Sequence, residues 1–307
     1  MNYWDSSLRS ARVNELLKVA KYSDYIRCDM AFLALNDVMG QNWGSQLSFW
    51  GYSRPSTEFW SDAIRTVKQQ YNVLFLAEVY NPNQQRMIDV GFDFVYEKTL
   101  YDHLAGGNLD DIRGYITGTS LNFHQHGAHF VENHDEPRAA SFFGSAIRAD
   151  AANAVSMTLP GLRFYFMGQE NGDKNKLDVH LRRGTPEPVN TGVNAYYNVL
   201  WKALSLDITK YGSWNYRNAQ GTGDSWRFLT WEWVYNGHKV LAVINYSDGE
   251  GAAYVVCPLA QPENGNDTIN LTELLTGTVY PRSAKQMSSQ GLMVVLGAWS
   301  VQMFQYN

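Results

Sequence analysis

Hydrophobic positions over the first two thirds of the chain repeat in one order: a helical stripe, a short apolar run and a polar loop. Residues 5–21 carry apolar side chains at helical spacing, and residues 25–30 follow as an apolar strand. Thr57 is placed to cap a second helix, which leads into the strand 73–77. The same order predicts strands at 92–96, 128–131 and 162–167 and helices at 109–117, 145–158 and 193–206.

Five continuous apolar strands that alternate with helices indicate an α/β fold with a parallel sheet buried on both faces. A doubly wound sheet and a (β/α) barrel both have this pattern. After about residue 207 the pattern changes to alternation of apolar and polar positions, with the turn signal Asn236-Gly237 between two such runs. We therefore expect two domains, residues 1–210 with the parallel sheet and residues 211–307 as a small antiparallel β-sandwich.

Charge and composition exclude several classes of partner. The chain has 25 Lys and Arg against 30 Asp and Glu, a net charge of -5, and no basic run that could neutralise a phosphate backbone. No apolar stretch reaches the roughly 20 residues that cross a bilayer, and the first residues do not resemble a secretory signal. Cys28 and Cys257 lie far apart and suggest no disulfide framework. We expect no nucleic-acid or membrane partner and a cytoplasmic location.

Acidic side chains follow every predicted strand. In a parallel α/β sheet the functional groups gather at the carboxyl ends of the strands, so these side chains should share one rim. Neighbouring carboxylates push one another's pKa values apart, which yields an acid beside an ionised partner, as hydrolysis of a glycosidic bond requires. A divalent metal held by carboxylates and His134 is the alternative, although no histidine spacing is typical of zinc. The residues, strand by strand, are Asp29, then Glu78, then Asp93 and Glu97, then Glu132, Asp135 and Glu136, and then Glu170.

Four ordered motifs carry a resemblance to the α-amylase family of glycoside hydrolases. The run DYIRCD (24–29) resembles the family's second signature, and FLAE (75–78) resembles the third. The run FVENHD (130–135) has the fixed positions of the fourth signature, and GQE (168–170) resembles the motif after the last barrel strand. The motifs stand in the family's order, and a β domain follows where the family has one.

The resemblance implies a retaining double displacement on an α-glucosidic bond. Asp29 would be the nucleophile, kept ionised by Arg27, and Glu78 would be the general acid and base, with a raised pKa. Asp135 and His134 would bond the sugar hydroxyls and strengthen those bonds toward the transition state.

Three more residues are candidates for substrate binding. Asn133 belongs to the fourth motif, and Tyr80 follows Glu78 by two positions. Trp43 lies in the long loop that we expect after the first strand, and a flat ring covers the apolar face of a sugar at a low entropy cost.

The sequence departs from the family pattern at Tyr25, where the second signature usually has Gly, and in two larger respects. After Asp29 stand Met30 and Ala31, where many members have the Lys-His pair that helps to bind calcium, so calcium is not supported and we expect no cofactor. The family's first signature has no counterpart in the 28 residues before Asp29. If the first strand matches the family's fourth, the chain holds a partial (β/α) barrel of about five units, followed by the antiparallel β domain.

Five parallel strands cannot close an eight-stranded barrel, and an open sheet leaves edges that invite pairing. We therefore expect a homo-oligomer, or pairing with a separate chain, through the open edge of the barrel. The expected function is a retaining glycoside hydrolase for starch-like glucans or oligosaccharides. The alternatives are a non-catalytic carbohydrate-binding or structural remnant of the family, and a glycosidase or transglycosylase of altered specificity.

Overall fold

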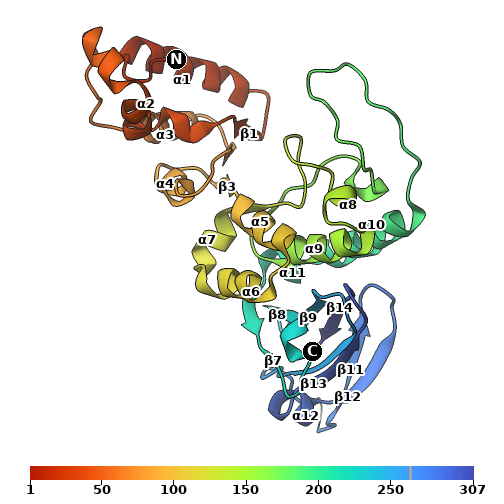
Figure 1. Cartoon of the computed structure of the whole chain (residues 1–307). Helices are drawn as coiled ribbons and strands as arrows, with labels where there is room; N and C mark the ends of the chain where they lie inside the picture. Colours follow the sequence, from red (N-terminus) through yellow and green to blue (C-terminus); the bar gives the residue numbers. More distant parts are fainter. Residues whose placement is uncertain (263–264) are drawn as a thin grey trace. The chain divides into compact units, whose positions relative to one another are not determined.

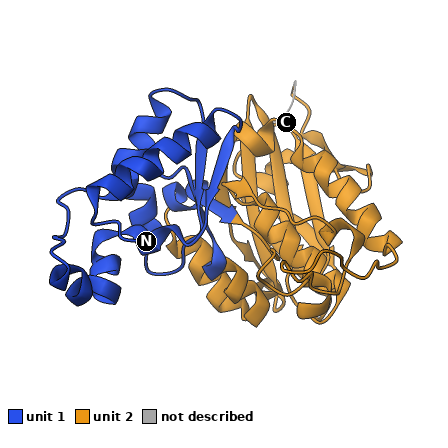
Figure 2. Ribbon diagram, turned by 90° about the horizontal axis from the view of Figure 1, so that it is seen from above, with its two compact units in different colours: residues 1–99, 121–128 blue, residues 100–120, 129–307 orange. Residues whose placement is uncertain are grey.

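The structure, a computed structural model, describes residues 1–262 and 265–307 (Figure 1). It divides the chain into two compact units, coloured separately in Figure 2. Unit 1 comprises residues 1–99 and 121–128, and unit 2 comprises residues 100–120 and 129–307.

Unit 1 alternates helices with parallel strands, as the hydrophobic pattern predicts. Strand β1 pairs with β2, β2 with β3, and β3 with β4, all in parallel. In the first of these pairs Cys28 lies opposite Ala77, so the next residues, Asp29 and Glu78, leave neighbouring strand ends. The elements are α1 (Ser6–Ala20), β1 (Tyr25–Cys28), η1 (Ala31–Ala34), α2 (Asn36–Phe49), α3 (Phe59–Lys68), β2 (Leu74–Ala77), α4 (Gln84–Asp89), β3 (Phe94–Tyr96), α7 (Leu121–His126) and β4 (Gly127–His129).

Two local predictions in unit 1 are wrong. Thr57 does not cap α3, because the helix begins after Glu58 and the Thr57 hydroxyl donates to the Asp62 carboxylate instead. The long loop expected around Trp43 is in large part helix α2. This segment contains Asn, Gln, Ser and two Gly and has no clear apolar stripe, so helical periodicity could not reveal it.

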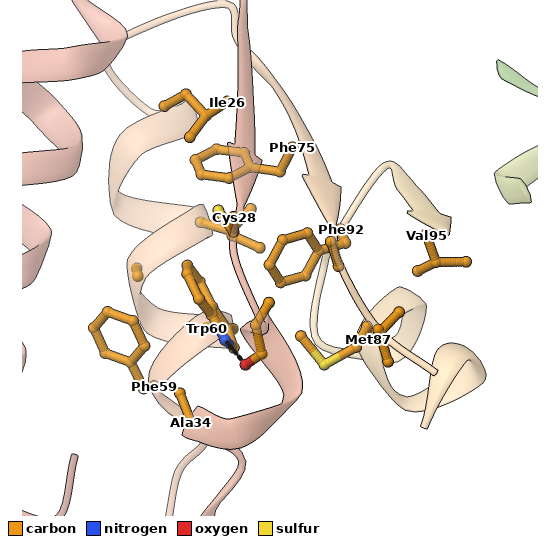
Figure 3. Close-up of a cluster of buried hydrophobic side chains, with 14 of the residues drawn as sticks. Ile26, Cys28, Ala34, Phe59, Trp60, Phe75, Met87, Phe92 and Val95 are labelled. Carbon is orange, nitrogen blue, oxygen red and sulfur yellow. Dashed lines mark hydrogen bonds between the residues drawn. The ribbon is translucent and has the colours of Figure 1, made fainter. Parts of the chain in front are cut away.

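Aromatic side chains form the core of unit 1 between α3 and the strands (Figure 3). Trp60 packs edge-on against Phe92, with ring centroids 4.9 Å apart, and Phe92 in turn packs against Phe75. The indole N–H of Trp60 donates to the carbonyl of Ala31 at 2.7 Å, so the buried polar atom has a partner. This bond ties α3 to the segment that directly follows Asp29.

Unit 2 contains the fifth strand and the remaining helices. The strand order of the parallel sheet is β1-β2-β3-β4-β5, so all five predicted strands are present, in chain order. Helix α9 begins where Ser145 accepts the backbone N–H of Arg148, and its last turns are buried. The elements up to the antiparallel sheets are α5 (Lys98–Gly106), α6 (Leu109–Gly118), α8 (Ala139–Phe142), α9 (Ala146–Thr158), β5 (Leu162–Arg163), η2 (Gln169–Asn171), α10 (Thr191–Leu204) and α11 (Ile208–Tyr211).

Two antiparallel sheets follow, with strand orders β13-β10-β7 and β12-β11-β14-β9-β8-β6. The predicted hairpin is confirmed: β8 and β9 pair along their full length and turn at Asn236 and Gly237. Both turn residues have positive φ, 49° and 84°, which the right-handed twist of a tight hairpin requires. The strands are β6 (Ser213–Arg217), β7 (Ala219–Gln220), β8 (Phe228–Tyr235), β9 (His238–Asn245), β10 (Gly251–Val255), β11 (Thr268–Glu273), β12 (Val279–Ser283), β13 (Leu292–Leu296) and β14 (Val301–Tyr306), with η3 (Ser225–Arg227) and α12 (Ala284–Ser289) between them.

The fold therefore consists of five parallel βα units followed by a small antiparallel β part, as predicted. Within the described residues, no helix combines the length and the apolar character needed to cross a membrane. The two cysteines are unpaired and buried, Cys28 in unit 1 and Cys257 in unit 2. Burial raises the pKa of each thiol to about 12.

Candidate active site

Arg27 joins two carboxylates at the carboxyl ends of β1 and β2. Its Nη1 lies 2.9 Å from Asp29 Oδ2, and its Nη2 lies 2.9 Å from Glu78 Oε2. Side chains alternate along a strand, so Arg27 and Asp29 share one face while Cys28 points into the core. The parallel register therefore brings together three residues that the sequence motifs singled out.

The two carboxylates have different surroundings. Glu78 is 5% exposed, and its carboxylate also accepts the backbone N–H of Met30 at 2.8 Å and the hydroxyl of Tyr80 at 2.8 Å. The side chain of Asp29 is 78% exposed, and Arg27 is its one partner at hydrogen-bond distance among the interactions assigned in the structure. Glu78 is thus held in a fixed orientation, whereas Asp29 faces open space.

Tyr96 is a member of this cluster that the sequence analysis missed. The Nε of Arg27 donates to the Tyr96 hydroxyl at 3.2 Å, and the guanidinium lies 5.5 Å from the centre of the ring. Burial works against the charge of Arg27, but the bonds with Tyr96 and Asp29 and the charge of Glu78 raise its pKa above the ordinary value. Tyr96 ends strand β3, so the rule that strand ends carry function could have found it.

The predicted strand-end residue Asp93 lies at the other end of its strand. It precedes β3, and its carboxylate accepts Lys68 Nζ at 2.6 Å and the backbone N–H of Phe75 at 2.7 Å. Asp93 therefore stabilises the entry to the sheet. Asp93 is already the second residue of the predicted strand 92–96, so the carboxyl-end rule selects Glu97 and not Asp93.

Trp43 and Asp29 line one cavity of unit 1, of about 290 Å³, together with Met30, Leu33 and Trp60. Trp43 is 62% exposed on helix α2, so its ring is available to a ligand. A flat apolar ring next to a carboxylate suits a sugar, which has both an apolar face and hydroxyl groups.

The motif residues 133–135 lie in unit 2 and form a tight turn. Asn133 is buried, and its Oδ1 accepts the backbone N–H groups of Asp135 and Glu136, each at 2.8 Å. Asn133 therefore shapes the turn. His134 Nε2 lies 3.1 Å from Asp135 Oδ2, and both side chains are partly exposed.

His134 and Asp135 line a second cavity, of about 390 Å³, within unit 2. The opposite wall comes from the segment after β5, with Lys176, Asp178 and His180. The Lys176 ammonium donates to the backbone carbonyl of Asp135. Sequence reasoning did not find Lys176, because it stands 41 positions away from Asp135 in a segment without a motif.

Within residues 1–262 and 265–307, no group of three or more His, Cys, Asp or Glu side chains is arranged to hold a metal ion.

Comparisons with known proteins point to one family. Residues 46–199 match the model of the α-amylase catalytic domain. The chain is 30% identical over 169 residues to the α-amylase MalA of Haloarcula japonica, an alignment that covers 52% of this chain and 22% of the relative. It is 30% identical over 134 residues to maltase 1 of Drosophila virilis, which covers 43% of this chain and 20% of the relative.

Solved structures show the same fold. The maltogenic α-amylase AmyB of Thermotoga neapolitana superposes with a TM-score of 0.75 at 16% identity, over 100% of this chain and 67% of that one. The α-amylase of Geobacillus thermoleovorans, solved with acarbose, superposes with a TM-score of 0.73 at 15% identity, over 100% and 65%.

The parallel sheet with carboxylates at its strand ends defines an α/β protein. The family model covers half of the chain, and the chain belongs to the α-amylase family. It spans about a fifth of the length of the curated relatives that it matches.

Proposed function

We propose that this chain is a retaining glycoside hydrolase that acts on α-glucosidic bonds. The observation that carries the proposal is the bridge from Arg27 to Asp29 and Glu78, at 2.9 Å on each side. One exposed and one buried carboxylate on neighbouring strands suit a nucleophile and an acid/base residue. The relatives named α-amylase and maltase support α-linked glucose as the substrate class.

In the first step, a carboxylate oxygen of Asp29 attacks the anomeric carbon while the bond to the leaving oxygen breaks. Glu78 gives its proton to that oxygen, so the aglycone departs as a neutral alcohol and a glycosyl ester remains on Asp29. In the second step, Glu78 takes a proton from water, whose oxygen attacks the anomeric carbon and releases Asp29. Two inversions give net retention.

The surrounding residues have supporting roles in the proposal. The Arg27 guanidinium holds the Asp29 carboxylate in place, and the Tyr80 hydroxyl orients Glu78. Trp43 offers its ring to a sugar next to Asp29. In unit 2, Asp135 and His134 are the proposed partners of sugar hydroxyls.

Replacing either carboxylate by its amide tests the proposal. The purified protein is incubated with soluble starch, maltooligosaccharides and aryl α-glucosides. We expect Asp29→Asn and Glu78→Gln each to lower kcat by at least about 100-fold, as loss of general acid–base or covalent catalysis does. Asp110→Asn is the matched control, because Asp110 is an exposed carboxylate in the first turn of α6 and its loss should leave activity unchanged.

NMR of the first sugar product tests whether the anomeric configuration is retained. An α-anomer released from an α-glucoside supports a retaining mechanism, and a β-anomer contradicts it. No turnover of any glucoside by the unaltered chain contradicts the enzymatic proposal. If sugars then still bind, the non-catalytic alternative takes its place. Transfer of the glucosyl group to an added sugar in preference to water identifies the transglycosylase alternative, which shares the first step.

A cytoplasmic location and pairing through the open barrel edge also remain proposals. The buried, unpaired thiols of Cys28 and Cys257 support a reducing compartment. The place of β1 at the end of the sheet order supports pairing at that edge.

A further inference from the structure

Two loops of unit 2 face one another across the 390 Å³ cavity. The first, residues 132–138, carries His134 and Asp135, and we call it the NHD loop. The second, residues 166–187, carries Lys176 and His180, and we call it the post-β5 loop. The shape of the cavity depends on how these two loops are fixed to each other.

Glu132 closes the base of the NHD loop. Its two carboxylate oxygens accept Arg138 Nη1 and the backbone N–H of Ala139, both at 2.6 Å. Burial raises the pKa of Glu132 to about 7, although the Ala139 N–H and the Arg138 charge act in the opposite direction. Between Glu132 and Arg138, the side chain of Asn133 accepts the backbone N–H of Asp135 and so fixes the turn.

Arg138 extends from this base to the post-β5 loop. It is 1% exposed, and its Nη2 donates to the carbonyl of Met167 at 2.9 Å and to Asp173 Oδ2 at 3.0 Å. The guanidinium also lies 4.8 Å from the centre of the Phe166 ring. One planar guanidinium therefore bonds both loops at once, in a geometry that a lysine ammonium cannot reproduce.

Other contacts fasten the loops on either side of Arg138. Lys176 donates to the carbonyl of Asp135, and the Ser141 hydroxyl donates to the carbonyl of Lys174 at 3.1 Å. Gly168 has a φ of 93°, and a Cβ at this position would overlap the Arg138 guanidinium and the Asp173 carboxylate. The absence of a side chain at Gly168 thus leaves the space that Arg138 needs.

We propose that Arg138 is a positioning residue that sets the separation of the NHD loop and the post-β5 loop, and through it the orientation of Asp135 toward the sugar. The sugar part of this inference rests on the proposed function. Arg138 is too deeply buried to reach a substrate, so it acts through the two loops.

Hydrogen exchange of the full chain tests the positioning directly. In Arg138→Lys and in Gly168→Ala, we expect the amides of Asp135 and Glu136 to exchange at least about 10-fold faster than in the unaltered chain, while the amides of β9 stay unchanged. Arg163→Lys is the matched control. Arg163 is another arginine of unit 2, which donates only to backbone carbonyls among the bonds assigned to it, and its loss should leave Asp135 and Glu136 unaffected.

Unchanged exchange rates at Asp135 and Glu136 overturn the proposal. An equal rise in the exchange rates of the β9 amides also overturns it, because Arg138 would then serve overall stability alone. If Arg138→Lys does not fold, Gly168→Ala decides, since it leaves every charge in place. The kinetic measurement is separate: with an active chain, kcat for a maltooligosaccharide should fall more than KM rises, because Asp135 is proposed to bond the sugar most strongly in the transition state. With an inactive chain the proposed function fails, and the exchange result still decides the role of Arg138.

Discussion

Arg27 is the residue on which the proposed chemistry depends most. It holds the two carboxylates that would otherwise repel one another at the strand ends. We predict that Arg27→Met lowers kcat by about 100-fold or more, because the Asp29 and Glu78 carboxylates lose the cation that holds them in position. Arg27→Lys keeps the charge but not the two-armed geometry, and should recover part of this loss.

Steady-state kinetics on an aryl α-glucoside measures both Arg27 variants. Equal losses in Arg27→Met and Arg27→Lys would assign the effect to the fork geometry alone. Retention of full activity by Arg27→Met would contradict the role of the bridge.

Asp150 gives a prediction on pH and stability. This residue of α9 is mostly buried, and burial raises its pKa from 3.8 to about 7. The folded state therefore prefers the neutral acid, so its contribution to stability is complete below pH 4 and is lost as the pH rises through 7. We predict that Asp150→Asn is nearly neutral below pH 4 and stabilises the protein above pH 7 by roughly 2–4 kcal/mol.

Urea unfolding of Asp150→Asn and of the unaltered chain at pH 4, 6 and 8 checks this dependence. A difference in the free energy of unfolding that does not grow with pH would show that Asp150 is solvated in the folded state.

At the residue scale, the rule that strand ends carry function predicted the positions of Asp29 and Glu78 because β1 and β2 run in register. Asp93 was a misapplication of the rule, because it precedes β3, whereas Tyr96 ends β3 and fits the rule but was not singled out. Lys176 and Arg138 could not be predicted, since their partners depend on how two distant loops fold together.

At the scale of elements, the β8–β9 hairpin is the clearest case of local control. Gly237 has a φ of 84°, which a side chain disfavours, and Asn236 tolerates its φ of 49°. We predict that Gly237→Val lowers the free energy of unfolding by about 1–2 kcal/mol. Asn236→Gly is the control, with a change within about 0.5 kcal/mol.

Chemical denaturation followed by tryptophan fluorescence compares the two hairpin variants. Trp231 and Trp233 lie on β8 and are buried, so they report on this sheet. A stability loss in Asn236→Gly equal to that in Gly237→Val would contradict the turn argument.

Helix α2 could not be predicted from the hydrophobic pattern of the sequence. Its only fully buried apolar residues are Val38, Met39 and Leu47, which is too few to give a helical stripe. The strands of the parallel sheet, by contrast, appear in the sequence as short apolar runs, with Ile26, Phe75 and Val95 buried on β1, β2 and β3. Sequence therefore predicts the sheet better than the segments that cover the cavities.

At the scale of the whole molecule, the open sheet leads to a prediction on association. Strand β1 stands at the end of the strand order, and Tyr25 on it is 61% exposed. We predict that the chain self-associates at micromolar concentration, because an exposed strand edge is a template for pairing. Sedimentation velocity over a range of concentrations measures this, and a stable monomer throughout would contradict it.

A substitution on β1 sharpens the association experiment. Tyr25→Lys places a charge on the exposed strand and should shift the equilibrium toward monomer. Tyr22→Lys, just before the strand and also exposed, is the control.

The domain boundary at residue 210 stays a prediction. In the structure, the first strand of the antiparallel sheets, β6, begins at Ser213.

The two cysteines give the molecule an internal pair of reporters. Cys28 is buried in unit 1 and Cys257 in unit 2, and both thiols stay protonated at neutral pH because burial raises their pKa to about 12. A thiol reagent can therefore modify each of them only after its own unit opens. The order in which the two thiols are labelled under increasing denaturant reads out the order in which the two units lose their structure, without any introduced probe.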